Sequence, residues 1–211
     1  MPNFPTKSPI GPIAGYYSLL AEYLPGVEIN PQRFGEKALE ILSTMAKTGP
    51  IFREAASYLI REDIALYITQ EQKGVGAGWH ENFAGERWIS IDRSIGFTYS
   101  LIVIGHEAHH MQQSIRKRCS VEGEYSAWRI GFKLRAELSG IPLTPDEQLL
   151  ASMPDNPTRE DLKKAQKLIQ KLAGPNYLIG KAPLQAADWQ TAVIVPFNKL
   201  INTFLGKGEQ L

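Results

Sequence analysis

The residues best suited to chemistry form one short run, Gly105-His106-Glu107-Ala108-His109-His110. His106, Glu107 and His110 make an H-E-x-x-H pattern, in which the two histidines stand four positions apart. On a helix this spacing places both imidazoles on one face, about one turn apart, so that they can share one ion. Two neutral imidazoles suit zinc, and the adjacent carboxylate can act as a general base toward water at the metal. The run therefore predicts a zinc site with hydrolytic chemistry.

The residues around this motif repeat with the period of an α-helix. Apolar residues fall on one stripe of the predicted helix, namely Leu101, Ile104, Ala108, Met111 and Ile115. His106 and His110 fall nearly opposite that stripe, so the core face and the metal face are separate. His109 lies off the metal face and is predicted to pack nearby without binding the ion.

A zinc ion held by two histidines needs at least one more protein ligand, and a catalytic site keeps a further position open for water. Glu122 and Glu124 follow His110 by twelve and fourteen positions. Between them and the motif, Arg116-Lys117-Arg118 predicts a turn that ends the first helix, and Ser120 predicts the cap of a second helix. A carboxylate in the early turns of that second helix would face back toward the histidines, and both glutamates are candidates.

Together these residues resemble the gluzincin branch of the zincin metallopeptidases, in which a second helix supplies a glutamate ligand. The resemblance covers roughly Ile64 to Leu138. It implies that Glu107 is the catalytic base and that the zinc ligands are His106, His110 and Glu124. It also implies that an exposed sheet edge above the metal holds an extended peptide by adding it as a strand.

Two further positions in the second helix bear on the third ligand. Glu124 is followed three positions later by Ala127, similar to the small-residue contact between the two helices of the family. Glu124 is therefore preferred, and Glu122 is the alternative. Some gluzincins place an aspartate four residues after the ligand to orient a histidine, but here that position is Trp128, which can only donate a hydrogen bond. The orienting acceptor must come from elsewhere.

The segments before the motif predict an extended arm, helices and then a small sheet. The arm covers residues 1 to 15, and the predicted helices cover 16–24, 31–47 and 51–61. Three short antiparallel strands are predicted over 64–69, 75–81 and 87–92, with 75–81 in the middle. After Leu138, helices are predicted over 144–153, 158–172 and 186–205, the last of them interrupted by Pro196.

The predicted fold class is α+β and zincin-like. A small antiparallel sheet packs on the H-E-x-x-H helix and the glutamate-bearing helix, with helical extensions at both termini. Residues 1–211 are predicted to form one domain, with an N-terminal helical part (1–63), a catalytic core (64–138) and C-terminal helices (139–211).

The composition indicates which kinds of partner are disfavoured and in which compartment the protein is expected. The chain has 211 residues and a net charge of +1 without a basic cluster, which disfavours nucleic acid and anionic membranes. Its longest apolar run, Leu101 to Ile104, is too short to span a bilayer, and no signal peptide is visible. One cysteine, Cys119, rules out an internal disulfide and fits a reducing compartment. The predicted location is the cytoplasm.

The predicted function is that of a zinc-dependent metallopeptidase, which hydrolyses a peptide or protein substrate with zinc-activated water and Glu107 as general base. The alternatives are a non-catalytic zinc-binding protein of zincin fold with a regulatory or scaffold role, and a buried polar helix whose motif arose by chance. His80, Tyr125 and Tyr177 are open candidates for stabilising the oxyanion. The sequence carries no signal for cleavage specificity or oligomeric state.

Overall fold

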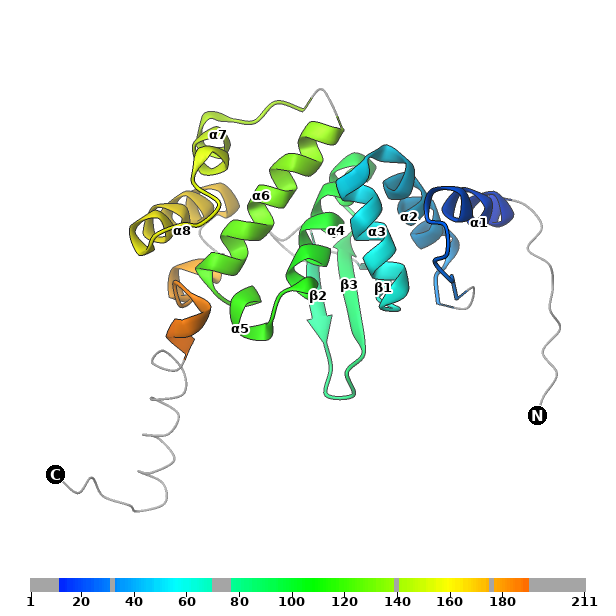
Figure 1. Cartoon of the computed structure of the whole chain (residues 1–211), viewed down its shortest axis with the longest axis horizontal. Coiled ribbons are helices and arrows are strands. Elements are labelled where there is room, and N and C mark those ends of the chain that lie inside the picture. Colours follow the sequence, from blue (N-terminus) through cyan, green and yellow to red (C-terminus); the bar gives the residue numbers. More distant parts are fainter. Residues whose placement is uncertain (1–11, 31–32, 70–76, 139–140, 175–176, 190–211) are drawn as a thin grey trace, which may run out of the picture. The chain divides into compact units, whose positions relative to one another are not determined.

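A computed structural model of the chain describes residues 12–30, 33–69, 77–138, 141–174 and 177–189 (Figure 1). Within these ranges the structure is α+β, with eight α-helices, two short 3₁₀ helices and one three-stranded sheet. None of these helices is long and apolar enough to cross a membrane. The chain divides into two compact units, Met1–His109 with Lys133–Pro142 and His110–Phe132 with Leu143–Leu211. The single domain expected from the sequence stays a prediction.

The first unit begins with three helices, α1 (Pro12–Tyr23), α2 (Glu36–Thr48) and α3 (Pro50–Arg61). Their apolar faces form a core in which Leu20, Leu42 and Phe52 are fully buried. Pro50 stands at the first helical position of α3, where its missing N–H removes no helical bond. The predicted arm is too long, because α1 begins at Pro12 and not at Tyr16. Residues 1–11 lie outside the described ranges.

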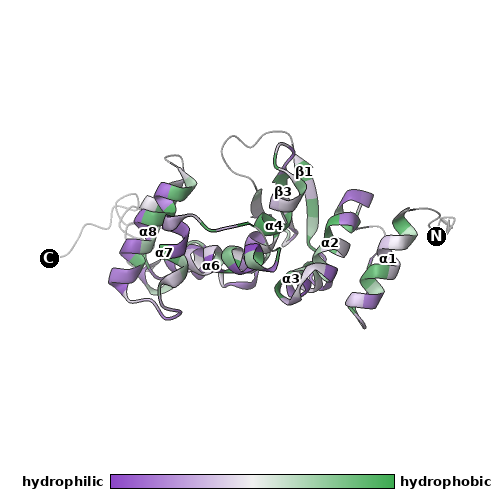
Figure 2. Ribbon diagram, turned by 90° about the horizontal axis from the view of Figure 1, so that it is seen from above, coloured by the Kyte–Doolittle hydropathy of each residue, from purple (hydrophilic) through white to green (hydrophobic). Residues whose placement is uncertain are grey.

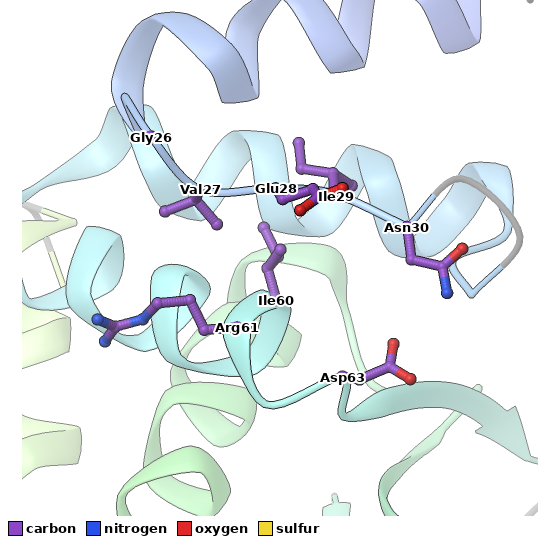
Figure 3. A pocket seen from close by; sticks show the side chains of 8 residues that line it. All are labelled: Gly26, Val27, Glu28, Ile29, Asn30, Ile60, Arg61 and Asp63. Carbon is purple, nitrogen blue, oxygen red and sulfur yellow. The ribbon is translucent and has the colours of Figure 1, made fainter.

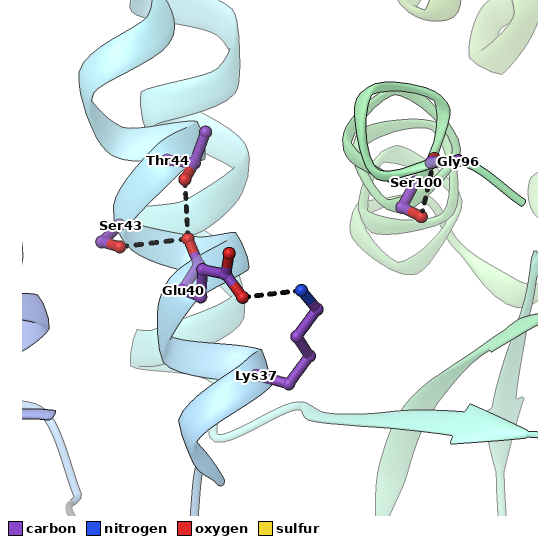
Figure 4. A network of polar contacts seen from close by, with 6 residues as sticks. All are labelled: Lys37, Glu40, Ser43, Thr44, Gly96 and Ser100. Carbon is purple, nitrogen blue, oxygen red and sulfur yellow. Dashed lines mark hydrogen bonds and ion pairs between the residues drawn. The ribbon is translucent and has the colours of Figure 1, made fainter. Parts of the chain in front are cut away.

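Polar side chains on α2 and at the start of helix α4 (Phe97–Gln112) form hydrogen bonds or ion pairs with nearby residues of the same segment (Figure 4). Lys37 Nζ lies 2.7 Å from Glu40 Oε2, three positions along α2. Thr44 donates its hydroxyl to the carbonyl of Glu40 at 2.8 Å, and Ser100 donates to the carbonyl of Gly96 at 3.2 Å. These bonds are local, so they stabilise single helices and do not build a site.

The sheet is mixed, and the prediction of an antiparallel sheet with residues 75–81 in the middle is wrong. Its strands are β1 (Ala65–Thr69), β2 (Ala77–Glu81) and β3 (Arg87–Asp92), in the order β1-β3-β2 (Figure 1). β2 and β3 form an antiparallel hairpin, whereas β1 pairs with β3 in parallel. β3 takes the centre because its last four residues are all buried, whereas the glycine-containing β2 is only partly buried and suits an edge.

The H-E-x-x-H motif lies on helix α4 (Phe97–Gln112), as the periodicity predicts. The predicted core stripe is buried at Leu101, Ile104 and Ala108, with exposed fractions of 2%, 0% and 0%. Ile115 leaves the stripe, because α4 ends at Gln112 and a separate helical turn, α5 (Ile115–Arg118), follows. The basic residues at 116–118 thus lie in a short helix of their own.

Helix α6 (Val121–Glu137) is the predicted glutamate-bearing helix, and its last residues complete the first unit. The carboxylate of Glu137 accepts the N–H groups of Ile51 and Phe52 at 3.0 and 3.3 Å, which caps the N-terminus of α3. A Cβ placed on Gly105 would lie 2.4 Å from Leu134 Cδ1. A glycine immediately before His106 therefore allows α4 and the end of α6 to pack closely.

The second unit contains the last residues of α4, helix α5 and the first part of α6. It continues with α7 (Pro145–Ser152), α8 (Arg159–Ala173) and the 3₁₀ helices η1 (Leu178–Lys181) and η2 (Ala186–Asp188). Thr144 and Thr158, the first residues of two predicted helices, cap α7 and α8, each in a reciprocal capping box. Hydrophobic and hydrophilic residues alternate along α8 (Figure 2), and the apolar ones join a core with Val121 and Phe132. The predicted helix over 186–205 begins as a 3₁₀ turn, and its part from 190 onward lies outside the described residues.

Candidate metal centre

His106, His110 and Glu124 form a cluster suited to a metal ion. Each offers one ligand atom, and the three atoms all lie within 4.8 Å of one another. His110 is 1% exposed, and its Nε2 lies 3.1 Å from Glu124 Oε1, whose side chain is 18% exposed. A carboxylate and imidazoles held together away from water gain from a shared cation. The structure therefore brings together the three residues that the sequence analysis names as ligands.

The donor set and its spacing fit a tetrahedral ion such as zinc. Zinc binds imidazole nitrogen and carboxylate oxygen at about 2.0 to 2.2 Å, which places neighbouring ligand atoms roughly 3.3 Å apart. The 3.1 Å between His110 and Glu124 is close to that value, and the 4.8 Å limit on all three atoms requires only small side-chain shifts. Three ligands also leave a fourth tetrahedral position for water or substrate.

The two candidate glutamates of α6 make different contacts. Glu122 Oε1 lies 3.3 Å from Lys117 Nζ, and Glu122 Oε2 accepts the N–H of Ala186 at 3.4 Å. Glu124 belongs to the metal cluster and Glu122 does not. The half-turn between the two residues thus separates a glutamate in an ion pair from a glutamate in the cluster.

The N–H groups in the first turn of α6, which have no acceptor within the helix, bond to groups outside it. Ser120 Oγ accepts the N–H of Gly123 at 3.2 Å, so Ser120 is the predicted cap. The N–H groups of Val121 and Glu122 donate to the carbonyls of Pro183 and Leu184 at 2.8 and 3.0 Å. These bonds fix the start of the helix one turn before Glu124.

Gly123 sets how closely this turn approaches α5 and Gln113, the residue that follows α4. A Cβ at this position would lie 2.0 Å from the carbonyl oxygen of Lys117 and 2.8 Å from Gln113 Oε1. Gln113 also donates its side-chain amide to the carbonyl of Gly123 at 3.2 Å. Only glycine admits this contact, which brings the residue next to Glu124 against the segment that follows His110.

Glu107 is held by the edge of the sheet. Its Oε2 accepts the backbone N–H of Trp79, on β2, at 3.2 Å. Glu107 is half-buried and is not among the three clustered ligands. Glu107 thus adjoins His106 in sequence but lies outside the cluster and bonds to the sheet.

The three candidates for oxyanion stabilisation have other contacts. Tyr125 is 2% exposed and donates its hydroxyl to the carbonyl of Pro154 at 2.7 Å. Burial raises the pKa of Tyr125, and the nearby Arg129 opposes that rise with a smaller effect. Tyr177 packs against the hydrophobic core of the second unit. His80 lies in β2, and its Nε2 lies 2.7 Å from Ser90 Oγ on β3.

The remaining residues singled out from the sequence lie beside the cluster or in the core. His109 is half-buried and does not belong to the cluster found among the described residues. Trp128 packs on the core of the second unit, with its ring 6.0 Å from that of Phe132. Cys119 is partly buried, and burial raises the pKa of its thiol. A raised pKa favours the neutral thiol, which is a poor nucleophile and ligand.

A cavity of about 520 Å³ lies elsewhere in the first unit (Figure 3). It is lined by the segment from Gly26 to Asn30 and by Ile60, Arg61 and Asp63 at the end of α3. None of these residues belongs to the cluster or to the H-E-x-x-H motif. The cavity therefore does not serve the candidate centre.

Three groups that shape the centre were missed from the sequence: the N–H of Trp79, the side chain of Gln113 and Gly123. The backbone N–H carries no sequence signal. Gly123 carries one, because glycine inside a helix costs up to about 1 kcal/mol relative to alanine and is retained where backbones must approach. Comparison of the chain with protein-family models, with curated proteins and with solved structures finds no significant match.

Proposed function

We propose that this protein is a zinc-dependent metallopeptidase of zincin type. The observation that carries the proposal is the cluster of His106, His110 and Glu124, whose ligand atoms lie within 4.8 Å of one another. The supporting features are the H-E-x-x-H helix α4, the glutamate-bearing helix α6 and a sheet whose edge strand β2 contacts Glu107. A zinc ion bound there would lower the pKa of a water molecule toward neutrality and polarise a carbonyl group.

In this proposal Glu107 is the general base. Its carboxylate takes a proton from water as the oxygen attacks the scissile carbonyl carbon, and then passes that proton to the leaving amine nitrogen. The C–N bond breaks, and the water supplies one proton to the amine and a hydroxyl to the new carboxylate. The position of Glu107, beside His106 on α4 and within bonding distance of β2, supports this role.

The proposed substrate is an extended peptide that pairs with the outer edge of β2. β2 is an edge strand in the order β1-β3-β2. An exposed edge offers main-chain groups that bind a peptide with little regard to its side chains. The same strand contacts Glu107, so a peptide added there would lie beside the proposed base.

The first test measures metal. Protein purified without added metal is analysed for zinc by mass spectrometry, and its cleavage of unfolded casein is followed with and without a zinc chelator. We expect one zinc ion per chain and chelator-sensitive cleavage. Protein that takes up no zinc when it is supplied would refute the metal centre, whereas zinc-loaded protein that cleaves no peptide would leave the non-catalytic alternative.

The second test separates the base from the ligands. Glu107→Gln should keep its zinc and lose at least about a hundredfold in cleavage rate, since removal of a general base costs about 10²–10⁴. Glu122→Gln is the matched control, because Glu122 pairs with Lys117 and lies outside the cluster. It should keep both zinc and activity. Wild-type cleavage by Glu107→Gln would contradict the mechanism.

A further inference from the structure

The hydrogen-bond pattern of the β2–β3 hairpin shows which way the N–H of Trp79 points. In an antiparallel pair, residues alternate between hydrogen-bonded and non-hydrogen-bonded positions. The N–H of Asn82 donates to the carbonyl of Glu86 at 3.0 Å, which marks that pair as hydrogen-bonded. In the same register Trp79 faces Ile89, three positions further on. Trp79 is therefore at a non-hydrogen-bonded position, and its N–H points to the outer edge of β2.

The neighbours of Trp79 hold this direction. The ring of His80 stacks on Trp88, with the centroids 5.2 Å apart and an angle of 13° between the planes. His80 Nε2 lies 2.7 Å from Ser90 Oγ, and Ser90 Oγ donates to the carbonyl of Gly78 at 3.4 Å. Both residues that flank Trp79 are thus tied to β3 by side-chain contacts in addition to the ladder. An edge strand anchored in this way keeps the peptide plane of Trp79 from rotating.

We propose that the outward N–H of Trp79 is a positioning group for Glu107. It donates to Oε2 at 3.2 Å and so selects one orientation of a side chain that otherwise has several rotamers. Because a carboxylate is planar, fixing Oε2 also fixes the direction of Oε1. This inference rests on the proposed function, in which the carboxylate of Glu107 receives a proton from water. With Oε2 bonded to Trp79, Oε1 is the oxygen that receives it. The edge strand thereby orients the base before any substrate binds.

The pairing of the two groups is tested by amide hydrogen exchange, which needs no activity. Exchange of the Trp79 amide is followed by NMR in wild-type protein, Glu107→Gln and Glu107→Ala. We expect exchange about tenfold faster or more in Glu107→Ala, and a smaller increase in Glu107→Gln, whose carbonyl still accepts a bond. The amide of Ala77 is the matched control, because it has the same position in the ladder and should not respond to Glu107.

The amides of Gly78 and His80 report whether β2 stays on the sheet, because they occupy the hydrogen-bonded positions that point toward β3. They should exchange equally in all three proteins. An unchanged Trp79 rate in Glu107→Ala, with Gly78 and His80 still protected, would overturn the proposed pairing.

The effect on catalysis is tested by replacing the Trp79 amide with an ester, which removes the N–H and keeps the indole. We expect zinc content to be unchanged and kcat to fall about tenfold or more, with KM changed less than kcat. The same replacement at Ala77 removes an outward N–H from the proposed peptide-binding edge, so it should raise KM. It should leave kcat within about twofold of wild type, because Glu107 bonds to the N–H of Trp79. An active wild type whose Trp79 ester cleaves at the same kcat would overturn this inference and leave the proposed function standing. A zinc-loaded wild type that cleaves nothing would instead overturn the proposed function, and hydrogen exchange would then decide the pairing alone.

Discussion

At the level of single residues, the centre depends on which carboxylate of α6 reaches the histidines. Glu124 is next to His110 at 3.1 Å, whereas Glu122, two positions earlier, pairs with Lys117 at 3.3 Å. Side chains two positions apart on a helix point in directions about 200° apart, so one residue faces α4 and the other faces away. The choice between them is a matter of helix phase and not of residue type.

A set of single substitutions tests this assignment of ligands. His106→Ala, His110→Ala and Glu124→Ala should each reduce zinc affinity by at least about tenfold, since each removes one of three ligands. His109→Ala and Glu122→Ala are the matched controls and should keep wild-type affinity. Isothermal titration with zinc measures all five. If Glu122→Ala lost zinc binding and Glu124→Ala kept it, the face of α6 assigned to the histidines would be wrong.

The residues of the cluster could be predicted from the sequence, because helix periodicity fixes directions over short distances. The i, i+4 spacing places His106 and His110 on one face, and the cap at Ser120 fixes the phase of Glu124. The contact between Trp79 and Glu107 could not be predicted, because it joins residues 28 positions apart through a backbone group. The role of Zn²⁺ and the identity of the base stay predictions.

At the level of secondary-structure elements, the close approach of α5 and the start of α6 positions Glu124. The carbonyl oxygen of Lys117, in α5, lies 2.0 Å from the place that a Cβ would occupy at position 123. This contact therefore fixes the position of Gly123, the residue directly before Glu124. A wider spacing here would move the carboxylate away from His110.

Gly123→Ala tests this contact. A Cβ 2.0 Å from a backbone oxygen must displace the start of α6, so we expect lower stability by about 1 to 3 kcal/mol and weaker zinc binding. Gly15→Ala is the matched control, because Gly15 is an exposed residue in α1 with nothing within 4 Å of the added Cβ. It should stabilise the protein by up to about 1 kcal/mol and leave zinc binding unchanged. Equal effects of the two changes on zinc affinity would exclude a special role for Gly123.

The N-terminus of α8 provides a test of pH dependence. The hydroxyl and N–H of Thr158 donate to Asp161 and lower the pKa of its carboxyl group. A folded-state pKa below the unfolded value, about 3.9, stabilises the protein above that value, and this contribution disappears as the pH falls through the folded pKa. Asp161→Asn should therefore be less stable than wild type at pH 7, with the difference shrinking below about pH 4. Urea unfolding at several pH values measures it, and a difference that stays constant with pH would contradict this account.

The elements themselves were well predicted where a local signal marks their ends. Helices α7 and α8 begin next to Thr144 and Thr158, where the sequence predicts two helix starts, and each threonine forms a capping box. The strand order was not predicted correctly, because the hairpin β2–β3 is set by a short turn whereas the placement of β1 beside β3 depends on which strand is most buried. The parallel pairing of β1 with β3 involves no hairpin turn, so no turn residues in the sequence indicate it.

At the level of the whole molecule, we expect metal binding and folding to be linked, because the three residues of the cluster come together only when α4 and α6 are formed. His106 and His110 are on α4 and Glu124 is on α6, so the unfolded chain holds no such cluster. An ion that binds the folded state alone stabilises it by an amount that grows with ion concentration. Stability can therefore report the metal centre even when no substrate is known.

We expect zinc at about a hundredfold excess over its dissociation constant to stabilise the protein by about 2.7 kcal/mol, which corresponds to a rise in thermal midpoint of roughly 5 to 10 °C for a chain of this size. Differential scanning calorimetry of chelator-treated protein, with and without zinc, measures the shift. Magnesium is the control ion, because it prefers an octahedral set of oxygen ligands and should have little effect.

The same measurement on variants separates binding at the centre from binding elsewhere. Glu107→Gln and His109→Ala should keep the full shift in thermal midpoint, because neither residue belongs to the cluster. His110→Ala should lose it, and the loss should be large, because His110 is 1% exposed and its ion is shielded from competing water. A shift that survives in both His110→Ala and Glu124→Ala would place the stabilising zinc at a different site and would remove the physical basis for the proposed chemistry.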